Sequence, residues 1–254
     1  MTATRFVLVF ALMLATLPIM CRSEVTGQTL EHATSVHLLV RITNIIASED
    51  LAQLSRVFAN ATTEAKRQRK PISPVWFVLD TPGGDVRAAM QIGRWARKND
   101  VTALVKGECS SACVLILAGA TSRQLLEDGR VGIHRTFFPT LDTSASYEQV
   151  RAQMRNADLE IAVYLQEMDV PVSLLEEMKS VPPNGIRYLT SAELDRLRLQ
   201  GTDPVAQERV DARMAKRYGV SREEYYRRYD RARRLCTRPE VDGKCIEAVL
   251  SGTR

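Results

Sequence analysis

The chain has 254 residues, of which 45% are hydrophobic and 26% charged, and its formal net charge is +5. This composition is ordinary for a globular protein with a sizeable core, and it excludes a wholly disordered chain. The length suffices for one large domain, or for a domain with an appendage. The chain has only three histidines, and its cysteine spacing does not match a zinc site, so we expect no metal.

The N-terminal segment, residues 1–23, has the features of an export signal. Arg5 precedes an apolar run, from Phe6 to Met20, that contains no charge. A run this short behind a basic start predicts a secretory signal peptide rather than a spanning helix. We expect cleavage after Ser23, with lipidation at Cys21 or retention as an uncleaved N-terminal anchor as alternatives. The protein is therefore expected to be exported, to the periplasm or another extracytoplasmic compartment.

From residue 36 onward, apolar runs of strand length alternate with helical segments. Strands are expected at 36–42, from 75 to a Pro-Gly-Gly turn, at 101–105 and around 131, and helices at 49–69, at 85–98, from about 111 and from 146. Strands that alternate with helices form βαβ units. The sequence therefore predicts an α/β fold with a largely parallel sheet.

The stretch from Gly107 to Gly119 is the most informative part of the chain. It follows a β-branched run, passes Ser110 and Ser111, and then becomes almost wholly apolar. This order predicts a strand, a tight turn and a buried helix that begins at about Ser111. A serine at such a turn lies beside unpaired N–H groups of the helix start, which can stabilise an oxyanion. The alternative is that one serine only caps a core helix.

Two flanking motifs favour catalysis. Upstream, a buried strand runs into Pro82-Gly83-Gly84, and downstream, a short strand from Gly129 ends in Ile133-His134. With the serine turn between them, these motifs resemble the proteolytic subunit of the Clp protease (ClpP), within the ClpP/crotonase superfamily. The resemblance covers roughly residues 36–203.

This resemblance implies stacked ββα units in a ClpP-like domain, which we place at 24–203. It also implies a serine peptidase that needs no cofactor. Ser111 takes the position of the nucleophile and His134 that of the general base. The oxyanion donors come from Gly83 or Gly84 and from Ala112.

The third member of the catalytic triad departs from the family pattern. The segment from Pro182 to Leu194 resembles the family segment that carries the triad aspartate, but Ile186 stands at that position. Asn184 is the nearest residue able to accept a hydrogen bond from Nδ1 of His134. Such an asparagine orients the ring without adding negative charge. We therefore expect a weakened triad, a Ser-His dyad or an inactive site.

The helix that begins near Ser146 carries an apolar seam with heptad-like spacing, which predicts that another helix packs against it. In the ClpP subunit the corresponding helix joins subunits, so the resemblance implies a homo-oligomer. Packing on its own domain is the alternative. The seam consists of Tyr147, Val150, Met154, Ala157, Ile161, Tyr164 and Met168.

Residues 204–254 form a basic helical extension. Thirteen basic residues against eight acidic ones give it a net charge of +5. Such a tail can meet an anionic membrane surface or another subunit, or lie solvated on its domain. Nucleic acid is not an expected partner of an exported protein.

Four cysteines remain after the export signal, an even number that suits an oxidising compartment. Cys236 and Cys245 bracket a short loop and predict a disulfide. Cys109 and Cys113 flank the serine turn and either pair or remain buried thiols.

The sequence thus predicts an exported ClpP-like serine peptidase that cleaves short, unfolded or membrane-derived peptides. No ATPase partner is expected, because the unfoldase of the Clp system is cytosolic. One alternative is a weak or inactive scaffold that binds peptides at the membrane. The other is a crotonase-like acyl-CoA enzyme, which export disfavours because CoA thioesters are cytosolic.

Overall fold

The computed structural model describes residues 24–137, 145–236 and 243–253. The predicted export signal, residues 1–23, lies outside the described residues. Within the described ranges, no helix combines the length and the apolar character needed to cross a membrane.

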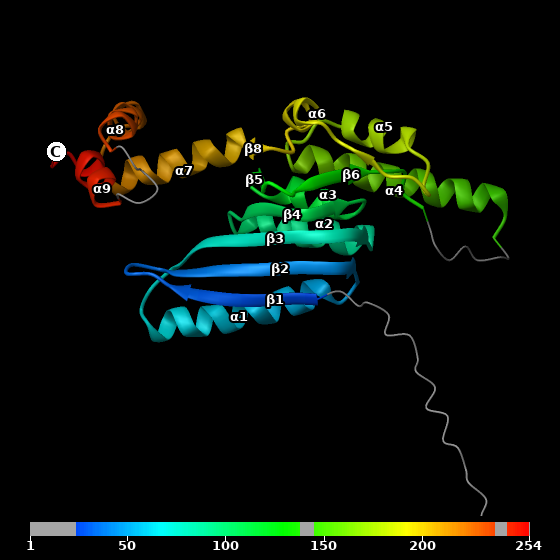
Figure 1. Cartoon of the computed structure of the whole chain (residues 1–254), viewed down its shortest axis with the longest axis horizontal. Helices are drawn as coiled ribbons and strands as arrows, with labels where there is room; N and C mark the ends of the chain where they lie inside the picture. The colour runs from blue at the N-terminus through cyan, green and yellow to red at the C-terminus, as the bar shows by residue number, and fades with distance from the viewer. Residues whose placement is uncertain (1–23, 138–144, 237–242, 254) are drawn as a thin grey trace, which may run out of the picture.

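A single sheet of eight strands forms the centre of the described structure (Figure 1). The strand order is β1-β2-β3-β4-β5-β8, and β6 pairs with β4 and β7. The central pairs β2–β3, β3–β4, β4–β5 and β4–β6 are parallel, which confirms the predicted α/β class. The strands are β1 (Glu24–Glu31), β2 (Val36–Ile46), β3 (Ile72–Gly84), β4 (Thr102–Ser110), β5 (Ser122–Leu125), β6 (Arg130–Ile133), β7 (Arg187–Tyr188) and β8 (Gly201–Thr202).

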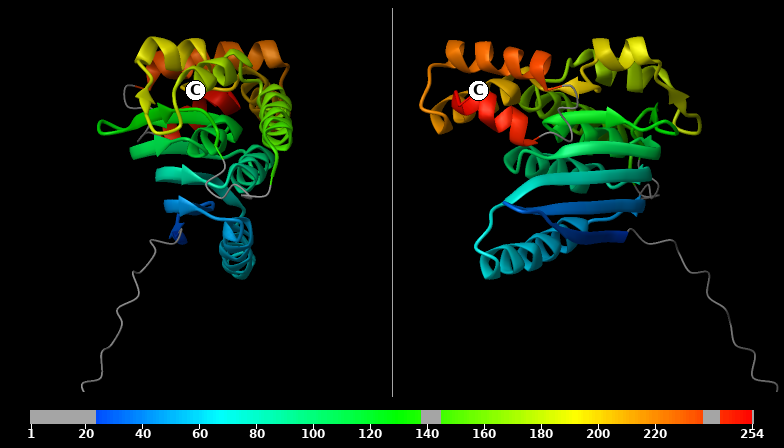
Figure 2. Two further views of the ribbon diagram at one scale, coloured as in Figure 1. Left: turned by 90° about the vertical axis from the view of Figure 1, so that its right-hand side faces the viewer. Right: turned by 60° about the vertical axis from the view of Figure 1, so that its left-hand side comes forward.

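Helices connect the parallel strands and cover the sheet. Figure 2 (left) shows α1, α2 and α4 on the same side of the sheet. The helices are α1 (Asp50–Arg67), α2 (Val86–Lys98), α3 (Cys113–Gly119), α4 (Tyr147–Glu167), α5 (Ser173–Ser180), α6 (Ser191–Arg196), α7 (Pro204–Arg217), α8 (Arg222–Leu235) and α9 (Gly243–Ser251).

Small residues let α2 and α3 approach closely at the centre of the core. A side chain at Gly119 would overlap the backbone of Gly93, and one at Gly93 would overlap the hydroxyl of Tyr164. That buried hydroxyl donates a 2.6 Å hydrogen bond to the carbonyl oxygen of Leu115 in α3. Burial also raises the pKa of Tyr164, so the phenol stays protonated as a donor. Every residue of α3 is buried, so this helix offers a rigid base for the turn before it.

The structure differs from the sequence predictions around the serine turn. Strand β4 continues through Gly107 to Ser110, five residues beyond the predicted end. Helix α3 begins at Cys113 rather than at about Ser111, because Ser111 has a left-handed backbone with φ 56°. The hairpin partner β1 was also not predicted. Only Val25 of this strand is buried, so its sequence lacks a strong strand pattern.

The apolar seam of α4 divides into two halves. Its C-terminal part, with Ile161, Tyr164 and Met168, is buried in the main core. Its N-terminal part is not, and the side chain of Tyr147 is 75% exposed. A capping box at Ser146 and Gln149 starts the helix. The alternative prediction, that the seam packs on its own domain, is therefore confirmed for the C-terminal half of the seam only.

The C-terminal helices α7, α8 and α9 extend to one end of the molecule (Figure 1) and hold two small apolar clusters of their own. Cys236 at the end of α8 is bonded to Cys245 in α9, with 5.9 Å between their Cα atoms. The predicted pairing is therefore present in the structure.

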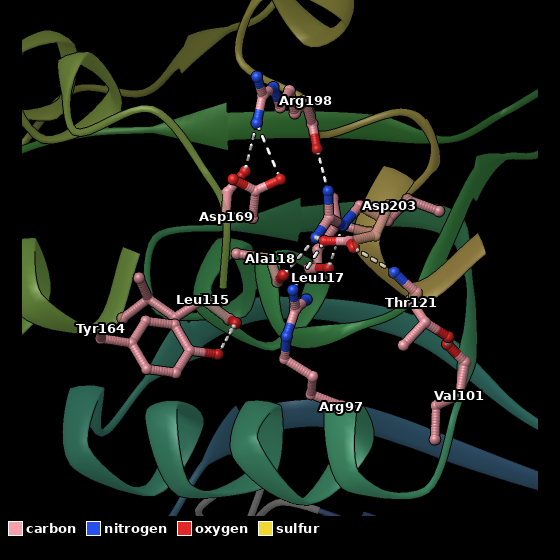
Figure 3. A network of polar contacts seen from close by, with 12 residues as sticks. Arg97, Val101, Leu115, Leu117, Ala118, Thr121, Tyr164, Asp169, Arg198 and Asp203 are labelled. Atoms are coloured by element: carbon pink, nitrogen blue, oxygen red, sulfur yellow. Dashed lines mark hydrogen bonds and ion pairs between the residues drawn. The ribbon is translucent and has the colours of Figure 1, made fainter. Parts of the chain in front are cut away.

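A buried ionic network holds the start of α7 on the main body of the molecule (Figure 3). Asp203 is 1% exposed and caps α7 by accepting from Ala206 N–H at 2.8 Å. It also pairs with Arg97 at 2.9 Å and lies 3.8 Å from Arg123. The guanidinium of Arg123 in turn donates to the carbonyl oxygens of Leu117 and Ala118 at the end of α3.

Candidate active site

Three parallel strands end at the same edge of the sheet and bring the predicted site residues together. Thr81 of β3 pairs with Cys109 of β4, and Ser110 of β4 pairs with Gly132 of β6. The Pro-Gly-Gly turn, the serine turn and His134 follow directly after these pairs. The carboxyl ends of parallel strands are the usual place for a ligand site in an α/β sheet.

Ser111, not Ser110, faces the solvent-accessible side of the turn. Its left-handed φ of 56° re-aims the chain between β4 and α3, and its N–H donates to the Gly132 carbonyl oxygen at 2.9 Å. Neither serine caps α3, since Ala112 holds that position without a side-chain bond. Ser110 is fully buried, and its hydroxyl donates to Glu108 at 2.6 Å. The reading of these serines as helix caps is therefore wrong.

Glu108 is held by a second donor besides Ser110. The hydroxyl of Tyr188 lies 3.1 Å from the same carboxylate oxygen, and the ring of Tyr188 stacks under the guanidinium of Arg130. Burial, together with the bond to Glu108, raises the pKa of Tyr188. Tyr188 therefore remains a donor at neutral pH, and the hydroxyl of Ser110 stays committed to Glu108.

The Pro-Gly-Gly turn lies directly against the serine turn. Gly83 has φ 107°, and a Cβ there would stand 2.6 Å from Cβ of Ser111 and 2.9 Å from the nitrogen of Ala112. Only glycine fits so close an approach at this φ. The N–H of Gly83 is already engaged by the hydroxyl of Thr81, at 3.1 Å. Of the two glycines predicted as oxyanion donors, Gly84 is therefore the better candidate.

The hydroxyl of Thr81 braces this turn. Besides accepting from Gly83, it donates to the carbonyl oxygen of Asn44, which has a left-handed φ of 61°. On the opposite side, no hydrogen bond within the described ranges engages the N–H of Ala112. That N–H remains available at the start of α3, as expected for an oxyanion donor.

His134 follows β6 and is only 6% exposed. Its Nδ1 lies 2.9 Å from the carbonyl oxygen of Arg135. A carbonyl can only accept, so Nδ1 carries the proton and the neutral ring keeps its lone pair on Nε2. This is the tautomer that a general base for Ser111 requires.

The structure does not bring Asn184 to His134. Asn184 is exposed and does not line the cavity that holds Ser111 and His134, whereas its neighbour Pro183 does. The main chain of Arg135 already supplies the partner of Nδ1. The segment itself runs beside the strand that precedes His134, because β7 pairs with β6. The assignment of Asn184 as the orienting residue is therefore corrected to the Arg135 carbonyl.

Ser111, His134, Gly83 and Gly84 line a cavity of about 980 Å³. Helix α4 forms one wall, and one of its residues, Glu160, is bonded to Arg87 at 2.9 Å. The hydrogen bond from Arg87 lowers the pKa of Glu160. The remainder of the lining mixes polar side chains with apolar ones, among them Ile45, Ile46, Val86 and Phe137. In the described part of the chain no three His, Cys, Asp or Glu side chains are grouped to hold a metal ion.

Sequence reasoning missed several residues of the site. The α4 side chains in the cavity wall follow a helical stripe of Gln153, Asn156, Ala157 and Glu160, and only the spacing hints at it. Thr81 carried no signal beyond its place before the glycines. The sequence left open whether Cys109 and Cys113 pair or remain thiols, and the structure joins them in a disulfide around the serine turn.

Comparison with known proteins agrees with this geometry. The model of the Clp protease family matches residues 19–167, which is more than half of the chain. The match includes the Pro-Gly-Gly turn, the serine turn and His134. A search of curated proteins found no match. The chain therefore belongs to the Clp protease family, a family of ClpP-like peptidases.

Proposed function

We propose that this protein is an exported serine peptidase with Ser111 as nucleophile and His134 as general base. One observation carries the proposal above the others. Ser111 stands in a left-handed turn that lines a cavity shared with His134, while Ser110 is buried against Glu108. A strained serine between a strand and a helix is typical of an activated nucleophile.

The proposed reaction begins with a peptide bond in the cavity. Ser111 Oγ attacks the carbonyl carbon while its proton passes to Nε2 of His134. The carbonyl oxygen becomes an oxyanion that accepts from the N–H groups of Ala112 and Gly84. The C–N bond breaks as His134 gives the proton to the leaving amine. Water then attacks the acyl-enzyme, with His134 again as base, and releases the acid and Ser111.

The Arg135 carbonyl orients His134 during these steps without contributing negative charge. A carboxylate at Nδ1 would stabilise the imidazolium that forms when the proton arrives. Because a neutral carbonyl takes the place of this carboxylate, we expect turnover to be slow. The same observation favours the second candidate, a ClpP-like scaffold that binds peptides and cleaves them poorly.

The proposed substrates are short or unfolded peptides, because the cavity is lined largely by apolar side chains and export removes the protein from cytosolic unfoldases. Members of the Clp protease family typically form oligomers and bind peptides. We extend this to the present chain as a homo-oligomer joined through α4. The basic extension, residues 204–254, is the proposed contact with an anionic membrane surface.

The first test is active-site labelling with a fluorophosphonate probe. We expect labelling of the wild type, loss of labelling in Ser111→Ala, and retention in the matched control Ser110→Ala. Peptide or casein turnover should follow the same order. Removing the nucleophile of a serine peptidase costs several orders of magnitude in kcat, roughly 10⁶-fold in a well-formed triad.

Two outcomes would contradict the proposal in different ways. Labelling that disappears only in Ser110→Ala would move the nucleophile by one residue. Peptide binding by the wild type, measured by fluorescence anisotropy, without labelling or turnover would replace the peptidase with the scaffold.

A further inference from the structure

The Cys109–Cys113 disulfide encloses the whole serine turn. Cys109 is the second-last residue of β4 and Cys113 is the first residue of α3. Both side chains are fully buried, and their Cα atoms lie 5.2 Å apart. The three residues between them are Ser110, Ser111 and Ala112. The covalent bond therefore closes a small ring around the proposed nucleophile and one proposed oxyanion donor.

This turn has a conformation that its sequence does not favour. Ser111 has φ 56°, in the left-handed region that residues other than glycine rarely adopt. Its hydrogen bond to Gly132 fixes one side of the turn. On the other side of the turn the structure places Gly83 within van der Waals distance and no side-chain cap. The carbonyl oxygens of Ser111 and Ala112 accept backbone hydrogen bonds from Val114 and Leu115. The disulfide adds a covalent link between the strand end and the helix start.

Small movements of this turn would matter for catalysis. Ser111 Oγ has to point at the carbonyl carbon of the substrate while Ala112 N–H points at the carbonyl oxygen. Both groups belong to residues of the ring that the disulfide closes. A displacement of about 1 Å in such a constellation can cost about 100-fold in rate. Peptide binding along the cavity does not depend on the turn to the same extent, because residues of helix α4, together with Ile45 and Ile46, form much of its wall.

We propose that the Cys109–Cys113 disulfide positions Ser111 and the Ala112 N–H for acyl transfer, so that the peptidase is competent only when this bond is oxidised. This inference rests on the proposed function. Reduction by a dithiol such as dithiothreitol transfers two electrons and two protons to the two sulfurs. The products are the thiols of Cys109 and Cys113 and the cyclic disulfide of the reagent. The turn then keeps only its backbone bonds and relaxes.

The chain supplies a matched control for this proposal. Cys236–Cys245 is also a buried disulfide with a short sequence separation, but it joins α8 to α9 in the C-terminal extension. Removing it makes the same chemical change and leaves the serine turn intact. An effect specific to Cys109 and Cys113 therefore cannot come from the loss of a disulfide as such.

The experiment compares Cys109→Ala/Cys113→Ala with Cys236→Ala/Cys245→Ala and the wild type. We expect the first variant to react with the fluorophosphonate at least about tenfold more slowly and to lose kcat, with KM for a short peptide changed less than about twofold. The control variant should label at the wild-type rate. Circular dichroism and thermal unfolding establish that each variant is folded at the assay temperature.

If the Cys109→Ala/Cys113→Ala variant does not fold, the wild type is titrated with dithiothreitol. Labelling should then fall in proportion to the thiols found at Cys109 and Cys113 by mass spectrometry, and return on reoxidation. Labelling that is independent of these thiols, or equal in the folded variant and the wild type, overturns the inference alone. A wild type that never labels at Ser111 overturns the proposed function and the inference together.

Discussion

At the scale of single residues, the site depends on close backbone approach more than on side-chain charge. Gly83 lies so near Ser111 and Ala112 that the two turns form one rigid unit. The partner of His134 is likewise a main-chain carbonyl, that of Arg135. Backbone groups do not titrate, and these lie next to the ends of the paired strands β3, β4 and β6. The site is therefore preorganised by strand pairing.

We expect Gly83→Ala to remove activity beyond its cost in stability. The new Cβ would meet Ser110 O at 2.7 Å and Ser111 Cβ at 2.6 Å, at φ 107°. The strain alone costs about 1–3 kcal/mol of unfolding free energy, and the displaced turn should lower the labelling rate about 100-fold.

The control for this change is Gly201→Ala, which also has a positive φ, of 85°, but nothing within 4 Å of its Cβ position. It should lose stability and keep the labelling rate. Equal labelling rates in the two variants, each measured below its unfolding temperature, would show that the contact with the serine turn is unimportant.

At the scale of elements, helix α3 is held at both ends. The disulfide to β4 fixes its first residue, and Arg123 covers the carbonyl oxygens at its end. A cation at a helix C-terminus also offsets the helix dipole. Burial lowers the pKa of Arg123 to about 10, with Asp203 acting in the opposite sense, so the guanidinium stays charged at neutral pH.

Asp203 balances this buried charge, and we expect Asp203→Asn to destabilise the fold. Asparagine keeps the capping bond to Ala206, so the change isolates the charge. Breaking a buried ion pair by removing one partner costs about 3–5 kcal/mol, because Arg97 and Arg123 are left uncompensated. The free energy of unfolding in urea at pH 7 measures this loss.

The pH dependence of this loss follows from the pKa of Asp203. Burial would raise that pKa, but the Ala206 N–H, Arg97 and Arg123 outweigh it and lower it. A depressed pKa stabilises the fold above the unfolded value of about 3.9 and ceases to do so as the pH falls through the folded value. The difference between wild type and variant should therefore shrink below about pH 4.

The exposed pair Arg198–Asp169 is the control, since Asp169→Asn should cost less than about 1 kcal/mol. A difference between wild type and Asp203→Asn that does not shrink as the pH falls below about 4 would contradict the assignment.

At the scale of the whole molecule, helix α4 and the C-terminal extension each offer an exposed surface for contact with another molecule. Helix α4 exposes Leu159 by 64% and Val163 by 52%, beside a groove that it shares with α2. The C-terminal extension is basic, but six of the nine arginines that the structure describes there are paired with a carboxylate. Arg213, Arg217, Arg222, Arg227, Arg228 and Arg234 each lie within 4 Å of a carboxylate. The apolar surface of α4 is thus the better candidate for subunit contact.

We expect Leu159→Ser/Val163→Ser to weaken self-association. Burial of one such side chain contributes about 1.5–3 kcal/mol, and each 1.4 kcal/mol corresponds to about tenfold in the dissociation constant. Sedimentation velocity across a concentration series measures the shift. Val205→Ser is the matched control, because Val205 is 49% exposed on α7. A wild type that stays monomeric at all concentrations, or a control that dissociates equally, would exclude this surface as the interface.

The sequence by itself determined the class of fold and the order of its central strands and helices. Alternating apolar runs and amphipathic helices predict a parallel sheet, and the structure confirms it, because these periodicities are local and survive without knowledge of partners. Three glycine-, serine- and histidine-bearing motifs also identified the family. The disulfide between Cys236 and Cys245 followed from a short loop and an even number of cysteines.

Only the tertiary structure shows which of these residues lie together. The burial of Ser110 against Glu108 involves Tyr188, which lies 80 residues from Glu108 in the chain. The hydrogen-bond partner of His134 Nδ1 in the structure is the Arg135 carbonyl rather than Asn184, and backbone carbonyls are identical in every sequence. Cys109 and Cys113 pair because the left-handed backbone of Ser111 brings the end of β4 close to the start of α3. Such contacts arise from backbone geometry and long-range packing, which composition and spacing do not encode.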